Sequence, residues 1–281
     1  MEHSFRDKLQ AAQQTNDSWL CVGLDPHPAL MPNLPELHSA GGLASFCRAI
    51  IAATSDLVCA YKPNLAFFLA HGSAGLRALE ETLAAVPRHI PVVLDAKIGD
   101  IGSTQRMYAE GFFGLLGVDA VTVNPYVGED AVIPLLEAYA GRGVFVLART
   151  SNADAPRFQD HPREGTRLYQ CVVSATRGWA QAHPQSTVGL VVGATHPHDL
   201  RTIREIAPEL PFLIPGIGTQ RGDLEAAVRF GPAADGCGPL INVSRAVIHA
   251  AAHADYAAAA RQSALQWRQS INYLRTEGQP A

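Results

Sequence analysis

Short apolar runs of strand length recur along the chain, and longer stretches with a helical period of apolar residues separate them. The runs are rich in Val, Ile and Leu and cover residues 19–25, 58–65, 91–99, 120–126, 143–150, 187–194, 212–218 and 238–244. Nearly continuous apolar runs are typical of strands that are buried on both faces of a parallel sheet. The helical patterns predict helices over residues 43–57, 75–86, 131–139, 168–182 and 223–230.

Eight predicted strands that alternate with helices are the element count of a (β/α)8 barrel. A doubly wound open sheet is the structural alternative, but that fold usually carries G-x-G-x-x-G after its first strand, where this chain reads LDPHPAL. No repeat or low-complexity linker divides the sequence. We therefore expect one α/β TIM-barrel domain over 1–281, with an N-terminal helical lead-in at 1–18 and one or two extra C-terminal helices at 245–281.

The composition argues against several classes of protein. Of the 281 residues, 47% are hydrophobic and 17% are charged, which is typical of a globular chain. The net charge of −4 provides no bulk attraction to nucleic acid or anionic lipid, so neither is expected as a partner. No apolar run is long enough to predict a membrane span, and the polar N-terminus lacks a signal core, so a cytoplasmic protein is expected. The five cysteines are scattered without a CxxC pair, which argues against a disulfide framework or a zinc site.

The segment LDAKIGDIGST, at the end of the third predicted strand, is the most informative for chemistry. The C-terminal ends of the strands are where barrel enzymes place their active sites. Alternation along a strand places Asp95 and Lys97 on one face, and Asp100 follows in the loop. A structural salt bridge is the alternative, but a buried ion pair adds little stability at such a position. Two carboxylates would keep Lys97 charged, which favours a proton donor or electrostatic partner over an amine nucleophile.

A second candidate site lies at the ends of the seventh and eighth predicted strands. The segment PGIGTQRGD contains Gly216 and Gly218, whose backbone can turn N–H groups toward an anion. Arg245 follows the eighth strand and can add a bidentate guanidinium. Barrel enzymes frequently bind phosphate with these two loops, so a phosphate site is predicted here, although turn glycines alone are common.

Polar residues at other strand ends are weaker candidates. Asp25 and Lys62 end the first and second predicted strands, and their position beside the Asp95 segment makes them candidates for the same site. His196 and His198 have the spacing of a metal pair, but no third ligand is evident, so a surface loop is expected there.

Taken together, these segments resemble a known family. LDAKIGDIGST is similar to the D-x-K-x-x-D-I-x-x-T signature of the orotidine 5′-phosphate decarboxylases. The segments CVGLDPHP, AYKPNLAFF, LARTSN, PGIGTQRGD and NVSRAV also occur in that family's order. The resemblance covers residues 5–260 and is greatest to the longer bacterial branch, although Ile98 replaces the basic residue that is more common in that branch.

The resemblance implies a carboxy-lyase that converts orotidine 5′-phosphate to UMP and CO2, the last step of UMP synthesis, without a metal or an organic cofactor. Lys62, Asp95, Lys97 and Asp100 match the family's catalytic tetrad, in which Lys97 would protonate C6 of the pyrimidine.

The resemblance also implies a homodimer with shared active sites. Asp100, Ile101 and Thr104 match residues that the family contributes across its dimer interface. The other substrate-binding matches are Asp25 and Lys62 near the ribose, Ser151 at the pyrimidine edge, and Pro215, Gly218, Gln220 and Arg245 in the phosphate-binding segments.

Two rival functions remain open at this point. A metal-dependent sugar-phosphate lyase or synthase on a related barrel would keep D-x-K-x-x-D but need magnesium. A non-catalytic nucleotide-binding protein could use the same scaffold, although the complete set of four charges argues against it.

Overall fold

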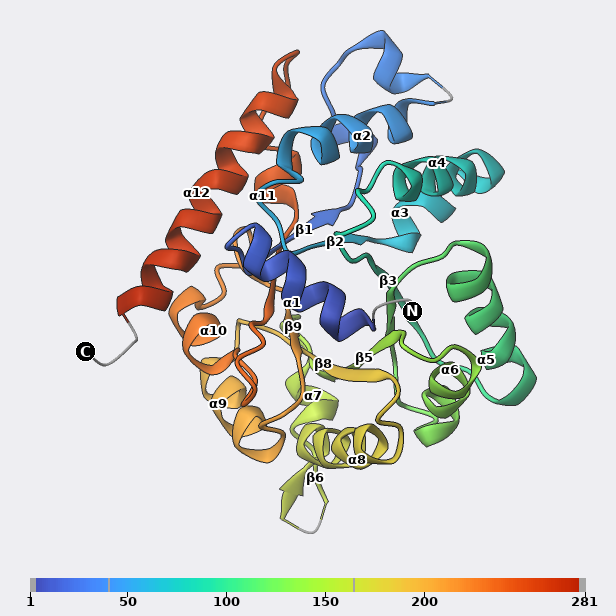
Figure 1. The fold of residues 1–281 in the computed structure, drawn as a ribbon, viewed down its shortest axis with the longest axis vertical. Coiled ribbons are helices and arrows are strands. Elements are labelled where there is room, and N and C mark those ends of the chain that lie inside the picture. Colours follow the sequence, from blue (N-terminus) through green and yellow to red (C-terminus); the bar gives the residue numbers. More distant parts are fainter. Residues whose placement is uncertain (1–3, 40, 164, 278–281) are drawn as a thin grey trace.

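The computed structural model describes residues 4–39, 41–163 and 165–277, and its central element is a sheet of eight parallel strands (Figure 1). The strands are β1 (Leu20–Leu24), β2 (Ala60–Pro63), β3 (Val93–Ile98), β4 (Ala120–Val123), β5 (Gly143–Arg149), β8 (Thr187–Val192), β9 (Phe212–Ile214) and β10 (Leu240–Val243). Their order in the sheet is β2-β1-β10-β9-β8-β5-β4-β3. Two bridges, Tyr61 with Val92 and Asn64 with Asp95, join the outermost strands β2 and β3 and nearly close the barrel. The eight strands and the barrel expected from the sequence are confirmed.

Helices surround the barrel and follow the strands in sequence. They are α1 (Phe5–Thr15), α2 (Gly42–Thr54), α3 (Leu65–Leu69), α4 (Gly72–Ala84), α5 (Gly102–Ala109), α6 (Ile133–Ala138), α7 (Pro156–Gln159), α8 (Leu168–Ala182), α9 (Pro197–Ile206), α10 (Leu224–Phe230), α11 (Arg245–Ile248) and α12 (Tyr256–Glu277). A π-helix, Glu110–Leu115, continues α5, and short 3-10 helices cover Pro28–Leu30, Pro35–His38 and Gly128–Ala131. The expected N-terminal helix is α1, and the expected C-terminal helices are α11 and α12.

Some elements were not predicted. The helices α3, α5 and α9 carry few buried apolar positions, because each packs only a narrow stripe on the barrel: α9, for example, buries Leu200 and Ile203. A two-stranded hairpin, β6 (Pro162–Arg163) with β7 (Thr166–Arg167), projects from the loop after β5. None of the helices in the described part of the chain is long and apolar enough to cross a membrane.

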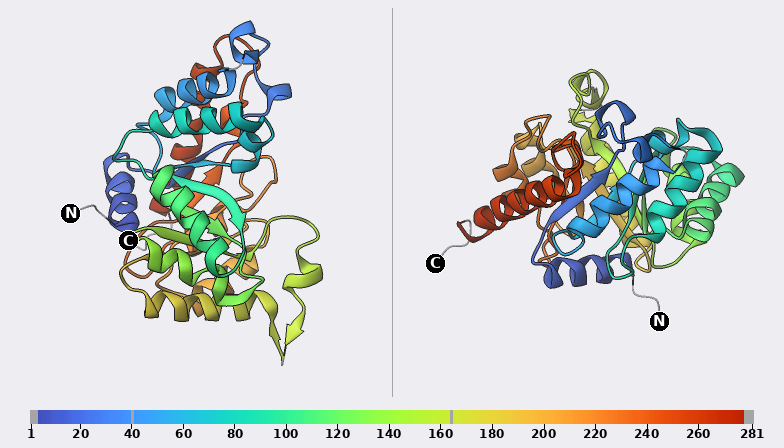
Figure 2. Two further views of the ribbon diagram at one scale, coloured as in Figure 1. Left: turned by 90° about the vertical axis from the view of Figure 1, so that its right-hand side faces the viewer. Right: turned by 90° about the horizontal axis from the view of Figure 1, so that it is seen from above.

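The helix α1 covers the N-terminal end of the barrel. Its Phe5 and Leu9 are buried in one cluster with inward-facing strand residues such as Phe145, and the rings of Phe5 and Phe145 meet edge to face at 5.5 Å. Ser4 and Asp7 form a capping box at the start of the helix. Figure 2 shows α1 and the β6–β7 hairpin at opposite ends of the barrel, so α1 closes the end away from the strand C-termini.

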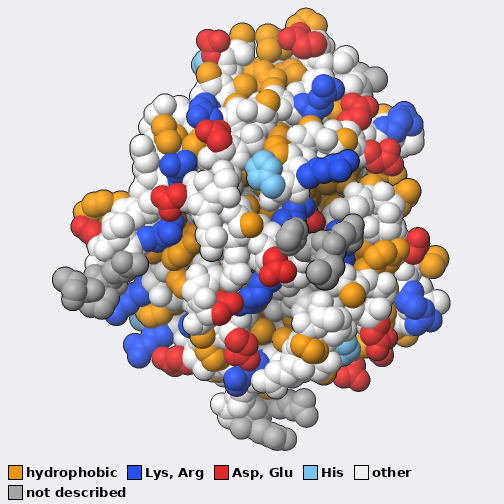
Figure 3. Space-filling model, in the orientation of Figure 1, with side chains coloured by type: hydrophobic (Ala, Val, Ile, Leu, Met, Phe, Trp, Pro, Cys, Tyr) orange, Lys and Arg blue, Asp and Glu red, His pale blue; other side chains and the backbone are white. Residues whose placement is uncertain are grey.

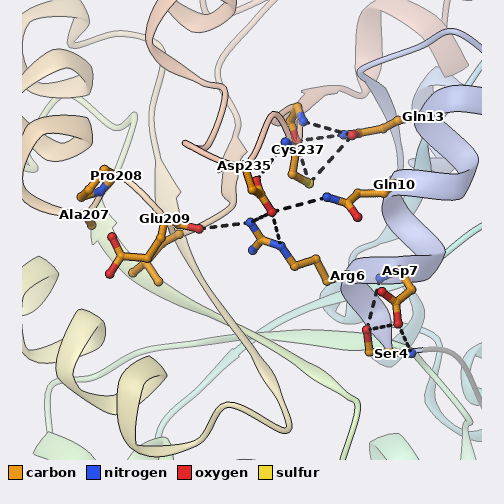
Figure 4. A network of polar contacts seen from close by, with 12 residues as sticks. Ser4, Arg6, Asp7, Gln10, Gln13, Ala207, Pro208, Glu209, Asp235 and Cys237 are labelled. Atoms are coloured by element: carbon orange, nitrogen blue, oxygen red, sulfur yellow. Dashed lines mark hydrogen bonds and ion pairs between the residues drawn. The ribbon is translucent and has the colours of Figure 1, made fainter.

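Polar contacts fasten α1 to the loops before β9 and β10 (Figure 4). Arg6 pairs with Asp235 at 2.6 Å and donates to the carbonyl of Glu209. The Gln13 side chain exchanges two hydrogen bonds with the backbone of Gly238. On the face shown in Figure 3, which includes this region, basic and acidic side chains are interspersed.

Arg204, at the end of α9, holds together three chain segments near this end. Its guanidinium donates to five backbone carbonyl groups and lies 3.5 Å from the centre of the Phe212 ring; the acceptors belong to Ala207, Pro208, Leu210, Phe230 and Gly231. Burial lowers the pKa of Arg204 to about 10, although the group is still charged at neutral pH.

Replacement of Arg204 by methionine removes the guanidinium donor from all five carbonyl groups, of which that of Pro208 keeps a second donor, the backbone N–H of Ala234. We expect Arg204→Met to lower the free energy of unfolding by about 2–4 kcal/mol. Urea unfolding monitored by circular dichroism measures the change. The control is Arg201→Met on the same helix, since Arg201 is exposed and forms an exposed ion pair with Glu205, and its cost should stay below about 1 kcal/mol. Equal costs for the two variants would contradict the role of Arg204.

Candidate active site

Three charged side chains meet at the C-terminal ends of β2 and β3. The Nζ atom of Lys62 donates to Oδ2 of Asp95 at 2.7 Å, and Nζ of Lys97 donates to Oδ1 at 2.5 Å. Ala60 and Val93 face the barrel interior, and two residues further along each strand the same face carries Lys62 and Asp95. The two strands are joined here by the bridge between Asn64 and Asp95, which brings the two side chains together.

Burial makes this charge set unusual. Lys62 is 3% exposed and Asp95 8%, whereas the side chain of Lys97 is 49% exposed. Burial alone would lower the pKa of Lys62, but the carboxylates of Asp95 and Asp25 outweigh it and raise that pKa above its ordinary value. Burial alone would raise the pKa of Asp95, but Lys62 and Lys97 hold it well below its usual range. Lys62 and Asp95 are therefore ionised, and the carboxylate of Asp95 lies fixed between the Nζ atoms of Lys62 and Lys97.

The backbone of β3 departs from a regular strand at these residues. Leu94 pairs with Val121 of β4, and Ile98 pairs with Val123, so the register shifts between the two pairs. Lys97 has a φ of 48°, in the left-handed region that residues with a Cβ rarely adopt. The sequence argument from simple alternation placed Asp95 and Lys97 together correctly, but the structure achieves it through a bulge.

Asp100, Ile101 and Thr104 lie beyond β3 and at the start of α5. In the described chain Asp100 makes no hydrogen bond or ion pair with Lys62, Asp95 or Lys97; its carboxylate accepts from the backbone N–H of Ile101 at 2.8 Å. Ile101 is 54% exposed, and Thr104 is exposed as well. One chain by itself therefore brings together three members of the predicted tetrad and leaves the fourth apart.

Asp25 lies beside the charge set, at the end of β1. Its Oδ2 accepts from the hydroxyl of Ser244 at 2.5 Å. Its Oδ1 is buried and has no hydrogen-bond partner among the described residues. Because a buried carboxylate oxygen is normally paired, this atom is well suited to accept a ligand hydroxyl.

Ser151 and Gln220 come together across the mouth of the barrel. The Ser151 hydroxyl donates to Oε1 of Gln220 at 3.2 Å. Gly193, directly after β8, also lies against Ser151. A Cβ at Gly193 would lie within 3 Å of Ser151, so only glycine allows the loop after β8 to approach the Ser151 loop this closely. Pro215 accepts from the backbone N–H of Ala194 at 2.9 Å, which ties the Gln220 loop to the same edge.

The remaining residues of the predicted phosphate site, Gly218 and Arg245, lie in two loops that are neighbours in the fold. Gly218 has a φ of 88°, and a Cβ there would lie 3.3 Å from the Cβ of Ala246, the residue after Arg245. Arg245 is the first residue of α11 and is exposed. The loops after β9 and β10 are thus adjacent, as the sequence argument for a phosphate site requires.

Arg149, at the end of β5, is buried and holds the neighbouring loop segments in place. Its guanidinium donates to Asp199 at 2.7 Å and pairs with Asp160 at 3.3 Å. The Gln159 side chain both accepts from the backbone N–H of Thr150 and donates to its hydroxyl. These contacts fasten the α7 segment to Arg149 and Thr150, the two residues before Ser151.

The His196–His198 motif is not a free surface loop. The helix α9 begins at Pro197, so His196 precedes the helix and His198 lies in its first turn. The sequence prediction placed a surface loop here because no third metal ligand is evident, but proline is favoured in a first helical turn, and the helix already includes His198. Within residues 4–39, 41–163 and 165–277, no three His, Cys, Asp or Glu side chains are grouped so that they could hold a metal ion.

Thr122 on β4 was missed by the sequence argument. Its hydroxyl contacts both Asp95 and the backbone of Lys97. The sequence did offer one sign of this role: Thr122 is the single polar residue in the apolar run AVTV, two positions after the inward-facing Ala120.

These features define a (β/α)8-barrel protein with a Lys–Asp–Lys set at the C-terminal ends of its strands, beside two glycine-containing loops. A model of the family described as "Orotidine 5'-phosphate decarboxylase / HUMPS family" matches residues 18–262. The chain belongs to this family.

Individual relatives match over almost their whole length. An orotidine 5′-phosphate decarboxylase of Thermomicrobium roseum is 48% identical over 98% of this chain and 97% of its own. That of Roseiflexus castenholzii is 50% identical over 96% and 97%. Among solved structures, the OMP decarboxylase of Leishmania donovani superimposes with a TM-score of 0.84 at 39% identity, covering 97% of this chain and 99% of that one.

Replacement of Asp95 by asparagine would leave the buried Lys62 without its counter-charge. We expect Asp95→Asn to lower the free energy of unfolding at pH 7 by about 3–5 kcal/mol. Because the fold holds the pKa of Asp95 below its unfolded value, this contribution is present above about pH 4 and is lost as the pH falls further. The difference between wild type and variant should therefore shrink below about pH 4.

Urea unfolding at pH 7 and at pH 3 tests both statements. The control is Asp56→Asn, which removes an exposed ion pair with Arg261 and should cost no more than about 1 kcal/mol. A loss for Asp95→Asn that is as small as the control's would show that the pair does not stabilise the fold.

Proposed function

We propose that the chain is a carboxy-lyase that converts orotidine 5′-phosphate to UMP and CO2, the final step of UMP synthesis. The observation that carries the proposal is the Lys62–Asp95–Lys97 set at the mouth of the barrel, in a chain that belongs to this family. Relatives that bear the name orotidine 5′-phosphate decarboxylase match nearly its full length.

The chemistry requires stabilisation of negative charge at one carbon. Loss of CO2 from C6 of the pyrimidine leaves an electron pair in the ring plane, which the ring's π-system cannot delocalise. The bond that breaks joins C6 to the carboxyl carbon; its electrons stay on C6 and then accept a proton. Fixed charges can stabilise this pair as it develops. Lys97, with half of its side chain exposed at the mouth, is placed to lie beside C6 and to donate the proton.

Asp95 contributes in two ways. It holds both lysines, and its own charge faces the position of the substrate carboxylate, which raises the energy of the bound substrate relative to the transition state. One unit-charge interaction at about 4 Å, with an effective dielectric constant of about 20, contributes roughly 4 kcal/mol, or about three powers of ten in rate. One interaction of this size is too little for a decarboxylation without a cofactor. Binding energy from the phosphate, which lies far from C6, must therefore help to align the charges.

The substrate-binding roles are those that the resemblance to the family implies, and the positions of the side chains support them. Asp25, with its unpaired Oδ1, and Lys62 are assigned to the ribose hydroxyls. Ser151 is assigned to the pyrimidine edge, and Gln220, which accepts a hydrogen bond from the Ser151 hydroxyl, is assigned to the phosphate. Arg245 and the backbone around Pro215 and Gly218 are assigned to the phosphate.

A homodimer with shared active sites completes the proposal. Asp100, Ile101 and Thr104 would enter the partner's site, which accounts for their separation from the charge set within one chain. Large apolar side chains are exposed on neighbouring segments of the chain: Ile101, with Met107 and Tyr108 on α5, and Tyr126 and Val127 in the loop after β4. Tyr126 is 88% exposed, and burial of such a group against a second copy would be favourable. The cytoplasmic location expected from the sequence stays a prediction.

The reaction can be followed directly by the loss of ultraviolet absorbance when orotidine 5′-phosphate is added. We expect wild-type activity that EDTA does not reduce. Lys97→Ala should lower kcat by at least about 1000-fold, because it removes the proton donor and the charge next to C6. UMP affinity, measured by calorimetry, should change by less than about 10-fold, since UMP carries no reacting carboxylate. Wild-type turnover by Lys97→Ala would refute the assigned role, and loss of activity with EDTA would favour a metal-dependent rival.

Shared sites can be tested by mixing two inactive variants. Lys97→Ala and Asp100→Ala should each be inactive as homodimers. A hybrid dimer contains one site with both native residues, so an equimolar, re-equilibrated mixture should recover about a quarter of wild-type activity. The control mixes Lys97→Ala with Asp95→Ala; if both residues belong to the same chain's site, that hybrid regains nothing. No recovery in the first mixture would contradict shared sites.

A further inference from the structure

We propose that Thr122 is a positioning residue for the decarboxylation: its hydroxyl fixes the carboxylate of Asp95 and the bulged backbone of Lys97, and so aims the Lys97 ammonium group at the reacting carbon. The inference rests on the proposed function for the identity of the reaction. The contacts from which it is argued are all between residues of the protein and involve no substrate atom.

Thr122 lies in the polar layer of the barrel interior. It is the third residue of β4, is 1% exposed, and follows the inward-facing Ala120 by two positions. Both neighbours along the strand, Val121 and Val123, belong to the apolar core between sheet and helices. The threonine hydroxyl therefore projects toward Asp95 from the strand next to β3.

The direction of each hydrogen bond can be assigned from the groups involved. The backbone N–H of Lys97 can only donate, so Oγ1 of Thr122 accepts from it at 3.0 Å. The hydroxyl hydrogen is then available for the ionised carboxylate of Asp95, whose Oδ1 lies 3.0 Å away. The same Oδ1 accepts from Nζ of Lys97 at 2.5 Å. Thr122 and Asp95 thus form a closed ring with the main chain and the side chain of Lys97.

This ring lies where the pairing of β3 with β4 is interrupted. Leu94 pairs with Val121 and Ile98 with Val123, so residues 95, 96 and 97 of β3 face the single residue Thr122 of β4. In a regular ladder the N–H of Lys97 would find a carbonyl oxygen; here the threonine hydroxyl takes that place. The N–H of Lys97 is partly buried, so the loss of its acceptor is unfavourable, and Lys97 already has an unfavourable positive φ. The hydroxyl therefore stabilises the backbone conformation from which the Lys97 side chain starts.

Loss of the hydroxyl should act on the reacting geometry more than on nucleotide binding. The half-exposed side chain of Lys97 has one ion-pair partner in the described chain, Asp95, so a small change in either group moves the ammonium. A displacement of about 1 Å in a catalytic group can reduce a rate by about 100-fold. No nucleotide contact is assigned to Thr122, so affinity for UMP has no reason to change.

The test compares Thr122→Val, which keeps the shape without the hydroxyl, with Thr122→Ser, which keeps the hydroxyl. We expect Thr122→Val to lower kcat for orotidine 5′-phosphate by about 10- to 100-fold, with UMP affinity within about 3-fold of wild type. Thr122→Ser should restore kcat to within about 3-fold of wild type. The matched control is Thr82→Val in α4, a buried threonine whose hydroxyl bonds to the carbonyl of Ala78, and its kinetics should be unchanged.

Three outcomes would each overturn the inference: a normal kcat in Thr122→Val, a loss of UMP affinity as large as the loss of kcat, or no recovery in Thr122→Ser. If Thr122→Val does not fold, Thr122→Ser and Thr122→Ala provide the same comparison, since both lack the methyl group and differ only in the hydroxyl. A wild-type protein without decarboxylase activity would refute the proposed function instead. An active wild type with an equally active Thr122→Val refutes only the role of Thr122.

Discussion

The ion pair between Lys62 and Asp95 is the constraint on which the mouth of the barrel depends. Both groups are almost fully buried, and neither charge could stay there without the other. The pair also spans the two outermost strands of the sheet order, β2 and β3, at the seam where the barrel closes. The same contact therefore joins the ends of the sheet and fixes the carboxylate that holds Lys97.

The barrel interior is apolar at its N-terminal end and charged at its C-terminal end, where the candidate site lies. At the N-terminal end, α1 seals an apolar layer that contains Ala60 and Val93, and two residues further the same strands present Lys62 and Asp95. Charges at the top of a sealed, water-poor interior interact more strongly than charges in water. They also need no reorganisation when the substrate arrives, which is the condition for electrostatic stabilisation of a developing charge.

In the proposed function the loops have a different task from the strands, because they are assigned to the parts of the substrate that do not react. Arg149 secures the segment after β5, and Ser151 with Gln220 joins that segment to the loop after β9. Asp100 is held against its own loop and contacts none of the three charged groups in its own chain. In the proposed dimer, one chain's strands supply three charges of the tetrad and its loops supply recognition, while the second chain supplies the fourth charge, Asp100.

Hydrophobic periodicity along the sequence determined the barrel, because burial on both faces of a strand leaves a local and nearly continuous pattern. It predicted all eight strands and the full extent of α8, and the strand ends directed attention to Asp95 and Lys97. It could not predict the β3 bulge or the role of Thr122, because a lone threonine in an apolar run carries no sign of a partner 27 positions away in the chain. Which strands close the barrel, and how the backbone of Lys97 turns, are decided by contacts between distant residues, and only the tertiary structure brings those residues together.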